Sequence, residues 1–91
     1  GEGMNRVFPN GSLIGVRKSA ETSELQDGDI VVFNCEGDYA VKRFYNDAAH
    51  DAYVFQPDSD KPGYFPVVYQ YDSDELINIV GKVVMYVVEL D

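Results

Sequence analysis

The sequence predicts a small, mostly β domain of antiparallel strands, with bent sheets and one or two short helical turns. Turn-forming residues recur along the chain, and the segments between them are short and rich in β-branched and aromatic residues. A chain of 91 residues has room for one hydrophobic core, so residues 1–91 are expected to form a single domain. The 45% hydrophobic and 13% aromatic content is typical of a packed globule and excludes a disordered segment.

Turn signals such as Pro9-Asn10-Gly11, Asp27-Gly28-Asp29 and Glu36-Gly37-Asp38 separate the predicted strands. The expected strands cover residues 12–17, 29–34, 39–45, 52–56, 67–71 and 76–90. Residues 2–8 are expected to form one helical turn and residues 19–25 another, the second capped by Ser19 or Thr22.

The last predicted strand, residues 76–90, is longer than an ordinary strand. Gly81 interrupts it where a bulge or sharp bend costs least, so we expect this segment to serve two sheets. Segments 29–33 and 83–88 are almost continuously apolar, which indicates strands that are covered on both faces or that lie at an interface. Met85 and Val87 share one face of the last strand. One face can fill the core while the other, or the strand edge, meets a partner, with Met85 and Val87 as the candidate dimer surface.

Charge and composition exclude several classes of function. Sixteen Asp and Glu against seven Lys and Arg give a formal net charge of -9, a sign that repels nucleic-acid backbones. The longest apolar runs are far below the roughly 18 to 20 residues of a spanning helix, so no membrane partner is expected. The single cysteine, Cys35, has no second thiol for a disulfide or a metal site, which fits a reducing cytoplasm.

Lys42 is the most informative residue. Strand alternation places Ala40, Lys42 and Phe44 on one face, so the lysine lies between two apolar neighbours. Desolvation in such a place lowers the pKa of an amine and can leave it neutral and able to act as a general base. The alternative is an edge-strand lysine that discourages aggregation, and the local sequence leaves both interpretations open.

Other candidate residues have simpler interpretations. His50 has no second histidine for a metal site or a Ser-His-Asp arrangement, so we expect it on the surface. The aspartates lack the spacing of a calcium loop and are interpreted as turn formers, so no metal and no cofactor are expected. Ser12 follows a turn and is expected to be a turn residue, with a nucleophile as the alternative. The acids beside Cys35 disfavour a reactive thiol.

Five segments in order resemble the self-cleaving C-terminal domain shared by LexA, phage lambda-type repressors and UmuD. That family carries Gly-Asp/Glu-Ser-Met, a Gly-Asp segment, a Val-Lys-Arg strand, a Leu-x-Pro-like strand with its loop, and an Ile-x-Gly-x-Val strand. The similar segments here are Gly1-Glu2-Gly3-Met4, residues 26–32, residues 40–44, Phe55-Gln56-Pro57 with Tyr64-Phe65-Pro66, and residues 79–84.

The resemblance implies a Ser-Lys dyad in which Lys42 is the general base. The separation of Gly3 and Lys42 is similar to that of serine and lysine in the family, so Gly3 occupies the position of the nucleophile and removes it. The backbone amides of Glu2 and Gly3 inherit the oxyanion role. The family cuts its own chain at an Ala-Gly or Cys-Gly bond, and neither dipeptide occurs in this sequence.

The resemblance also implies a role in regulation. We expect the C-terminal domain of a LexA-like or prophage repressor that forms a homodimer and, with an intact serine, would cleave itself under stimulation by RecA filaments. Operator DNA would be bound only through a missing upstream domain. The alternatives are a UmuD-like polymerase accessory protein, a signal-peptidase relative acting on an external substrate, or a degenerate module kept for dimer formation alone.

Overall fold

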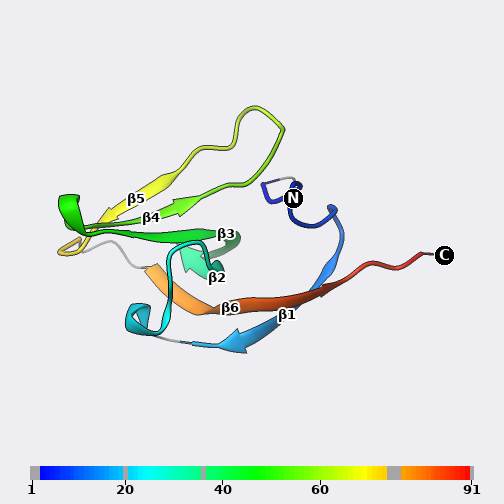
Figure 1. Cartoon of the computed structure of the whole chain (residues 1–91), viewed down its shortest axis with the longest axis horizontal. Coiled ribbons are helices and arrows are strands. Elements are labelled where there is room, and N and C mark those ends of the chain that lie inside the picture. Colours follow the sequence, from blue (N-terminus) through cyan, green and yellow to red (C-terminus); the bar gives the residue numbers. More distant parts are fainter. Residues whose placement is uncertain (1–2, 20, 36, 74–76, 91) are drawn as a thin grey trace.

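Six strands form one antiparallel sheet in the order β1-β6-β2-β3-β4-β5 (Figure 1). The computed structural model of the chain describes residues 3–19, 21–35, 37–73 and 77–90. The strands are β1 (Leu13–Lys18), β2 (Ile30–Cys35), β3 (Asp38–Asp47), β4 (Ala52–Gln56), β5 (Val67–Gln70) and β6 (Ile77–Val87), and the two 3₁₀ turns are η1 (Thr22–Glu24) and η2 (Ala48–His50). The predicted class, a mostly β antiparallel domain with short helical turns, is confirmed.

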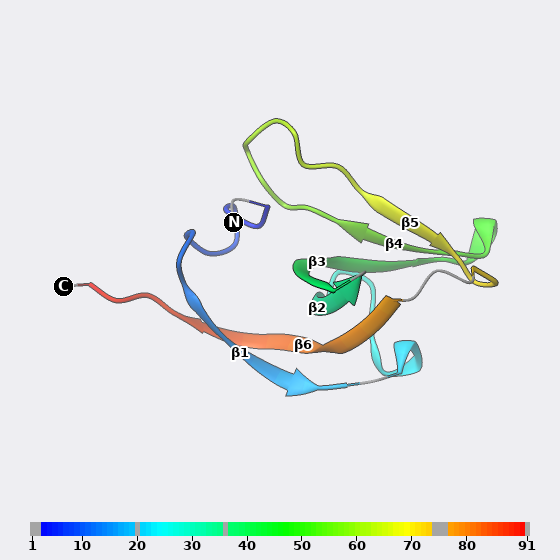
Figure 2. The same cartoon turned by 180° about the vertical axis from the view of Figure 1, so that it is seen from behind.

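The prediction that the last segment serves two sheets is wrong. β6 pairs with β1 on one side and with β2 on the other, so it lies inside a single sheet. Figures 1 and 2 show how the sheet bends instead: the ribbon of β1 and β6 lies on one side and β3, β4 and β5 lie on the other, with β2 between them. One long strand can therefore take part in both halves of a bent sheet without leaving it.

Gly81 lies where the register of β6 against β2 shifts. It pairs with Val32 of β2, next to that shift, and with Lys18 of β1 on the other side. A Cβ atom at Gly81 would lie only 2.2 Å from the carbonyl oxygen of Arg17. The predicted interruption at Gly81 is thus a close approach of two backbones, which only glycine permits.

The hydrophobic core is built from residues of the inner strands and of β5. Its buried members come from four successive strands of the sheet, and Ile77 and Ile79 of β6 pack against them. The rings of Phe33 and Phe55 are 4.4 Å apart, which is close for an aromatic pair. Val31, Val32 and Phe33 are all buried, so β2 is covered on both faces, as its continuous apolar sequence predicted. The buried core set is Val31, Phe33, Phe44, Phe55 and Tyr69.

Both predicted helical segments are short, but the expected cap is wrong. Residues 3–8 form a turn in which the Val7 and Phe8 amides donate to the Met4 carbonyl. In η1 the N-cap residue is Glu21, which makes no side-chain capping bond. The Thr22 hydroxyl instead forms a hydrogen bond with the Tyr53 hydroxyl of β4, 3.2 Å away.

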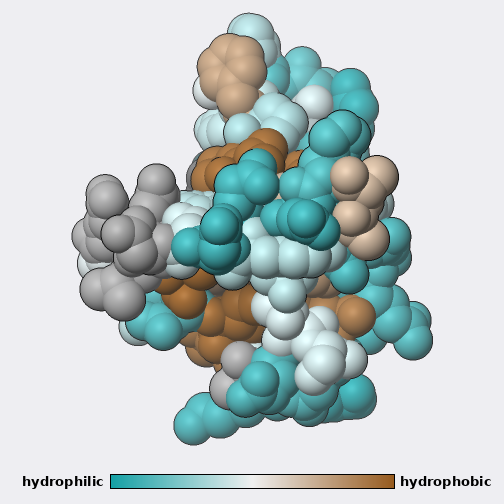
Figure 3. Space-filling view, turned by 90° about the vertical axis from the view of Figure 1, so that its left-hand side faces the viewer, coloured by the Kyte–Doolittle hydropathy of each residue, from teal (hydrophilic) through white to brown (hydrophobic). Residues whose placement is uncertain are grey.

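The expectation that one face of the last strand fills the core is also wrong. Met85 and Val87 are 56% and 50% exposed, and the alternate residues Val84, Tyr86 and Val88 are exposed as well. At this end β6 pairs only with β1 and runs past the rest of the sheet, so side chains on both of its faces stay partly exposed, although Phe8 contacts Tyr86 (Figure 1). The opposite end, where η2 lies, is covered mainly by hydrophilic side chains (Figure 3). None of the helices in the described part of the chain is long and apolar enough to cross a membrane.

Gly81→Ala tests the bend. The added methyl group meets backbone atoms that cannot move aside, so we expect a loss of about 3 kcal/mol or more in the free energy of unfolding. Gly15→Ala is the matched control, since its Cβ meets only the exposed and flexible Met85 side chain. Urea denaturation followed by circular dichroism measures both. Equal stabilities of the two variants would contradict this account of Gly81.

Candidate active site around Lys42

Lys42 lies in β3, an inner strand of the sheet between β2 and β4, and is paired with Val31 of β2. The edge-strand interpretation of this lysine is therefore wrong. Its neighbours on the same strand face, Ala40 and Phe44, both pack in the core. Lys42 is half-buried between them, and among the described residues it has no ion-pair partner.

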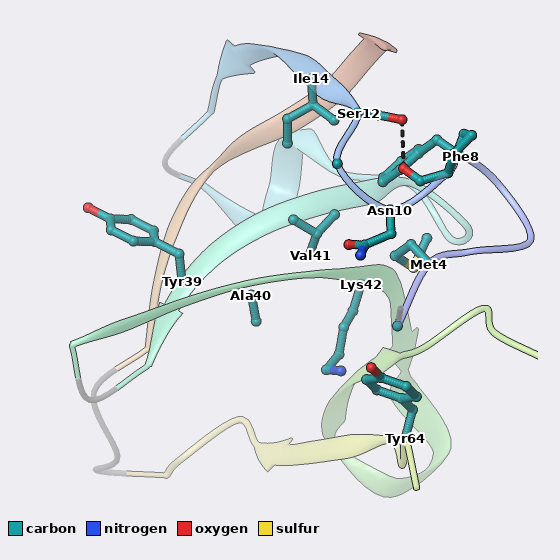
Figure 4. Close-up of a pocket in the computed structure, with 13 residues that line it drawn as sticks. Met4, Phe8, Asn10, Ser12, Ile14, Tyr39, Ala40, Val41, Lys42 and Tyr64 are labelled. Carbon is teal, nitrogen blue, oxygen red and sulfur yellow. Dashed lines mark hydrogen bonds between the residues drawn. The ribbon is translucent and has the colours of Figure 1, made fainter. Parts of the chain in front are cut away.

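The Lys42 side chain extends into a cavity of about 360 Å³ (Figure 4). The walls come from three parts of the chain: the N-terminal turn (residues 3–8), residues 9–14 leading into β1, and β3, with Tyr64 from the loop after β4. Figure 4 shows Lys42 and Tyr64 pointing toward one another from opposite sides. The lining combines apolar and polar groups, and among the described residues its titratable members are Lys42, Tyr39 and Tyr64.

Burial in this cavity lowers the pKa of Lys42 below its ordinary value of 10.5. The physical cause is desolvation, which disfavours the charged ammonium more than the neutral amine. The direction is the one predicted from the apolar neighbours in the strand. An amine of this kind carries a larger neutral fraction near neutral pH than an exposed lysine does, so it is better suited to accept a proton.

Gly3 lines the same cavity as Lys42, so residues 39 positions apart in the chain are brought together. A hydrogen bond from the Asp58 amide to the Gly3 carbonyl, 2.8 Å long, ties Gly3 to the loop after β4. A Cβ atom at residue 3 would lie 3.3 Å from Cδ1 of Tyr64. A side chain is therefore admitted there if the tyrosine ring, which is 38% exposed, shifts by a few tenths of an ångström.

The other residues singled out in the sequence fall into place as follows. Glu2 lies outside the described residues, and the oxyanion role of the Glu2 and Gly3 amides stays a prediction. The Ser12 hydroxyl donates to the Pro9 carbonyl at 2.6 Å, as expected of a turn residue, and lies on the opposite wall of the cavity from the Lys42 amine (Figure 4). His50 is exposed and pairs with Asp47. The Cys35 side chain lies outside the described part of the structure.

Sequence reasoning missed Tyr64 and Asp58 as neighbours of the site. Both lie in the loop between β4 and β5, where strand periodicity says nothing about direction. Of the two, only Tyr64 carried a signal in the sequence, because it lies in a segment that resembles the family. Among the described residues, no group of three or more His, Cys, Asp or Glu side chains comes together as a metal-binding set.

Lys42→Met tests the desolvation. Because the pKa of Lys42 is lower in the folded state than in the unfolded state, folding is penalised while the lysine stays protonated, and stability is recovered as pH rises from the lowered pKa toward 10.5. Methionine carries no such penalty. We therefore expect Lys42→Met to raise the free energy of unfolding at pH 7, with a gain that shrinks as pH increases.

Urea denaturation of the parent chain and Lys42→Met between pH 7 and pH 10 measures this difference. Lys61→Met is the control, because Lys61 is exposed on the loop after β4. A gain that is independent of pH would contradict desolvation and leave only better packing.

Comparison with known proteins identifies the family of the chain. A family model described as Peptidase S24-like matches residues 1–84 of the chain. The chain is also 40% identical over 74 residues to the LexA repressor of Geobacter sp. (strain M21), a match that covers 81% of this chain and 33% of that protein. The chain thus spans about a third of the length of the curated relative it matches. The resemblance inferred from the motifs is confirmed: the chain belongs to the Peptidase S24-like family, as a LexA-like domain.

Proposed function

We propose that this chain is the C-terminal domain of a LexA-like or prophage transcriptional repressor, with two roles. One role is to pair two subunits. The other role is self-cleavage by a Ser-Lys dyad, for which its cavity is arranged. The observation that carries the proposal is the Lys42 amine, its pKa lowered by burial, in the same cavity as Gly3.

The cavity supports the chemistry of a dyad when residue 3 is serine. The neutral Lys42 amine takes the serine proton, and the serine oxygen forms a bond to the carbonyl carbon of the scissile peptide. Backbone amides near residue 3 stabilise the resulting oxyanion. The carbon–nitrogen bond then breaks, the Lys42 ammonium gives its proton to the departing amine, and water hydrolyses the acyl-serine.

In this chain the reaction stops before its first step. Gly3 has no hydroxyl group, so nothing attacks the carbonyl. Loss of the nucleophile of a serine peptidase lowers turnover on the order of a millionfold. We therefore propose that the chain as it stands is inactive and that its remaining role is the pairing of subunits.

The pairing surface proposed here is the uncovered end of β1 and β6. Met85 and Val87 are about half exposed, and Leu13, which pairs with Val87, is 74% exposed. Exposed apolar side chains that gather on one strand ribbon favour contact with another protein. A twofold arrangement would place the same ribbon of the second copy against this one.

An upstream domain would supply the contacts with DNA. The matched relative is about three times as long as the matched segment and is named a repressor. The net charge of -9 disfavours direct contact of this domain with a phosphate backbone. We propose that operator DNA is bound by the upstream part, in the cytoplasm, and that dimer formation here raises affinity for a palindromic operator. A RecA filament would be the stimulus in a serine-containing relative.

Gly3 itself favours a second candidate, a degenerate module that forms dimers and has no peptidase activity in any context. The two candidates differ in whether the cavity still works once the hydroxyl is restored. A UmuD-like polymerase accessory protein remains an alternative for the whole protein.

Gly3→Ser tests the dyad. The serine requires only a small shift of the Tyr64 ring, so the variant is expected to fold. With a peptide that contains an Ala-Gly bond and one that contains a Cys-Gly bond, cleavage should appear and rise about tenfold per pH unit until Lys42 is deprotonated, because the base must be neutral.

Mass spectrometry of the products measures the rate between pH 7 and pH 10. Gly3→Ser with Lys42→Ala should abolish cleavage, and Gly3→Ala is the control for the side-chain volume. A correctly folded Gly3→Ser chain that cuts neither peptide at any pH would leave the degenerate module as the function.

Val87→Glu tests the pairing surface. An uncompensated carboxylate in a buried interface is costly, so we expect dimer formation to weaken by at least about tenfold. Val68→Glu is a matched control, because Val68 of the edge strand β5 is 55% exposed and Val87 is 50% exposed. Sedimentation equilibrium measures both. A parent chain that stays monomeric at high micromolar concentration, or equal effects of the two variants, would contradict this surface.

A further inference from the structure

The N-terminal turn (residues 3–8) is attached to the loop after β4 by a set of directional bonds. The Asp58 amide donates to the Gly3 carbonyl at 2.8 Å, and the Arg6 amide donates to the Asp58 carbonyl at 3.1 Å. Next to these, Asn5 and Asp60 form two hydrogen bonds. The Asn5 side-chain amide donates to the Asp60 carboxylate, and the Asp60 backbone amide donates to the Asn5 side-chain oxygen. Asp58 is therefore bonded through its backbone on both sides of the turn.

Arg43 holds the Asp58 side chain in place. The Arg43 Nε donates to the Asp58 carboxylate at 2.9 Å, and Nη1 of the same guanidinium donates to the Gly28 carbonyl at 2.7 Å. Both side chains of the ion pair are less than a third exposed. A planar guanidinium with two partners in fixed directions holds them more rigidly than a lysine could. We use the name Arg43–Asp58 latch for three interactions: the ion pair of Arg43 with Asp58, the bond from Arg43 to the Gly28 carbonyl and the bond from the Asp58 amide to the Gly3 carbonyl.

The position of Arg43 in the chain gives the latch its significance. Arg43 directly follows Lys42 in β3, so one short stretch of a central strand carries both the amine in the cavity and the anchor of the turn that lines it. Apolar contacts also hold the turn, through the buried Met4 and through the contact of Phe8 with Tyr86. Such contacts resist removal of the turn but are not directional, whereas hydrogen bonds fix where residue 3 lies.

We propose that Arg43 and Asp58 are positioning residues, which hold residue 3 beside Lys42 and close the cavity over its amine. The significance for catalysis rests on the proposed function, but the geometric claim does not. It can be tested in the chain as it stands, with glycine at position 3.

The test is the pKa of Lys42, measured by NMR titration of lysine labelled with ¹³C at Cε, in the parent chain, Asp58→Ala and Arg43→Gln. Each variant opens the latch and admits water to the amine, so the pKa of Lys42 should rise toward 10.5 in both. The double variant should raise it no further than either single one, because all three lose the same latch.

The Asp58→Ala result separates the latch from simple electrostatics. Removal of a nearby carboxylate destabilises a lysine cation and by itself lowers the lysine pKa, which is opposite to the effect expected here. A folded Asp58→Ala chain in which the pKa of Lys42 is unchanged or lower would overturn the proposal. Asp47→Ala is the matched control, since it removes an aspartate side-chain hydrogen bond of the same 2.9 Å length, to His50, at the far end of β3. If Asp58→Ala does not fold, Asp58→Asn takes its place under the same criterion.

A second measurement connects the latch to chemistry. In a Gly3→Ser background, Asp58→Ala should lower peptide cleavage about 100-fold, the loss typical of a reacting group misplaced by about 1 Å. The pH at which cleavage reaches half its maximum should rise together with the pKa of Lys42. If Gly3→Ser alone cuts nothing, the proposed dyad fails, while the NMR titration still decides whether the latch exists.

Discussion

The burial of one amine on a central strand is the constraint on which the rest of this site depends. Lys42 lies between core residues of β3, and its cavity is closed by segments that are distant in sequence: the N-terminal turn, the residues before β1 and the loop that carries Tyr64. Burial of Lys42 in this site removes water from the amine. This burial lowers the stability of the folded chain and produces an amine whose pKa lies below that of an ordinary lysine.

The bend of the sheet makes such a cavity possible in so small a domain. A flat six-stranded sheet would leave one face of β3 open to water, whereas here the sheet bends and the β1–β6 ribbon lies on the opposite side from β4 and β5 (Figure 2). The residues that lead into β1 then reach the cavity from the far half of the sheet. β6 also runs past the rest of the sheet, and its partly exposed end forms the apolar ribbon proposed for subunit pairing.

Sequence reasoning succeeded where local rules apply. Turn chemistry and strand composition located all six strands, and β4 was predicted at Ala52–Gln56, as observed. Strand alternation placed Lys42 between Ala40 and Phe44. It failed where the answer depends on distant contacts: the two faces of β6 could not be told apart, because their exposure depends on how far β6 runs past the sheet. The contacts of Asp58 with Arg43 and Gly3 were equally invisible, since a loop has no periodicity.

The most direct test of the central claim is the protonation of Lys42 in the unaltered chain. Selective ¹³C labelling of lysine, with Lys42→Arg to assign the resonance, gives its titration curve between pH 6 and pH 12. The account predicts a midpoint below 10.5 under conditions in which the chain stays folded. A midpoint at or above 10.5 would mean that the amine is fully hydrated. Lys42 would then be no better suited to act as a general base than an exposed lysine.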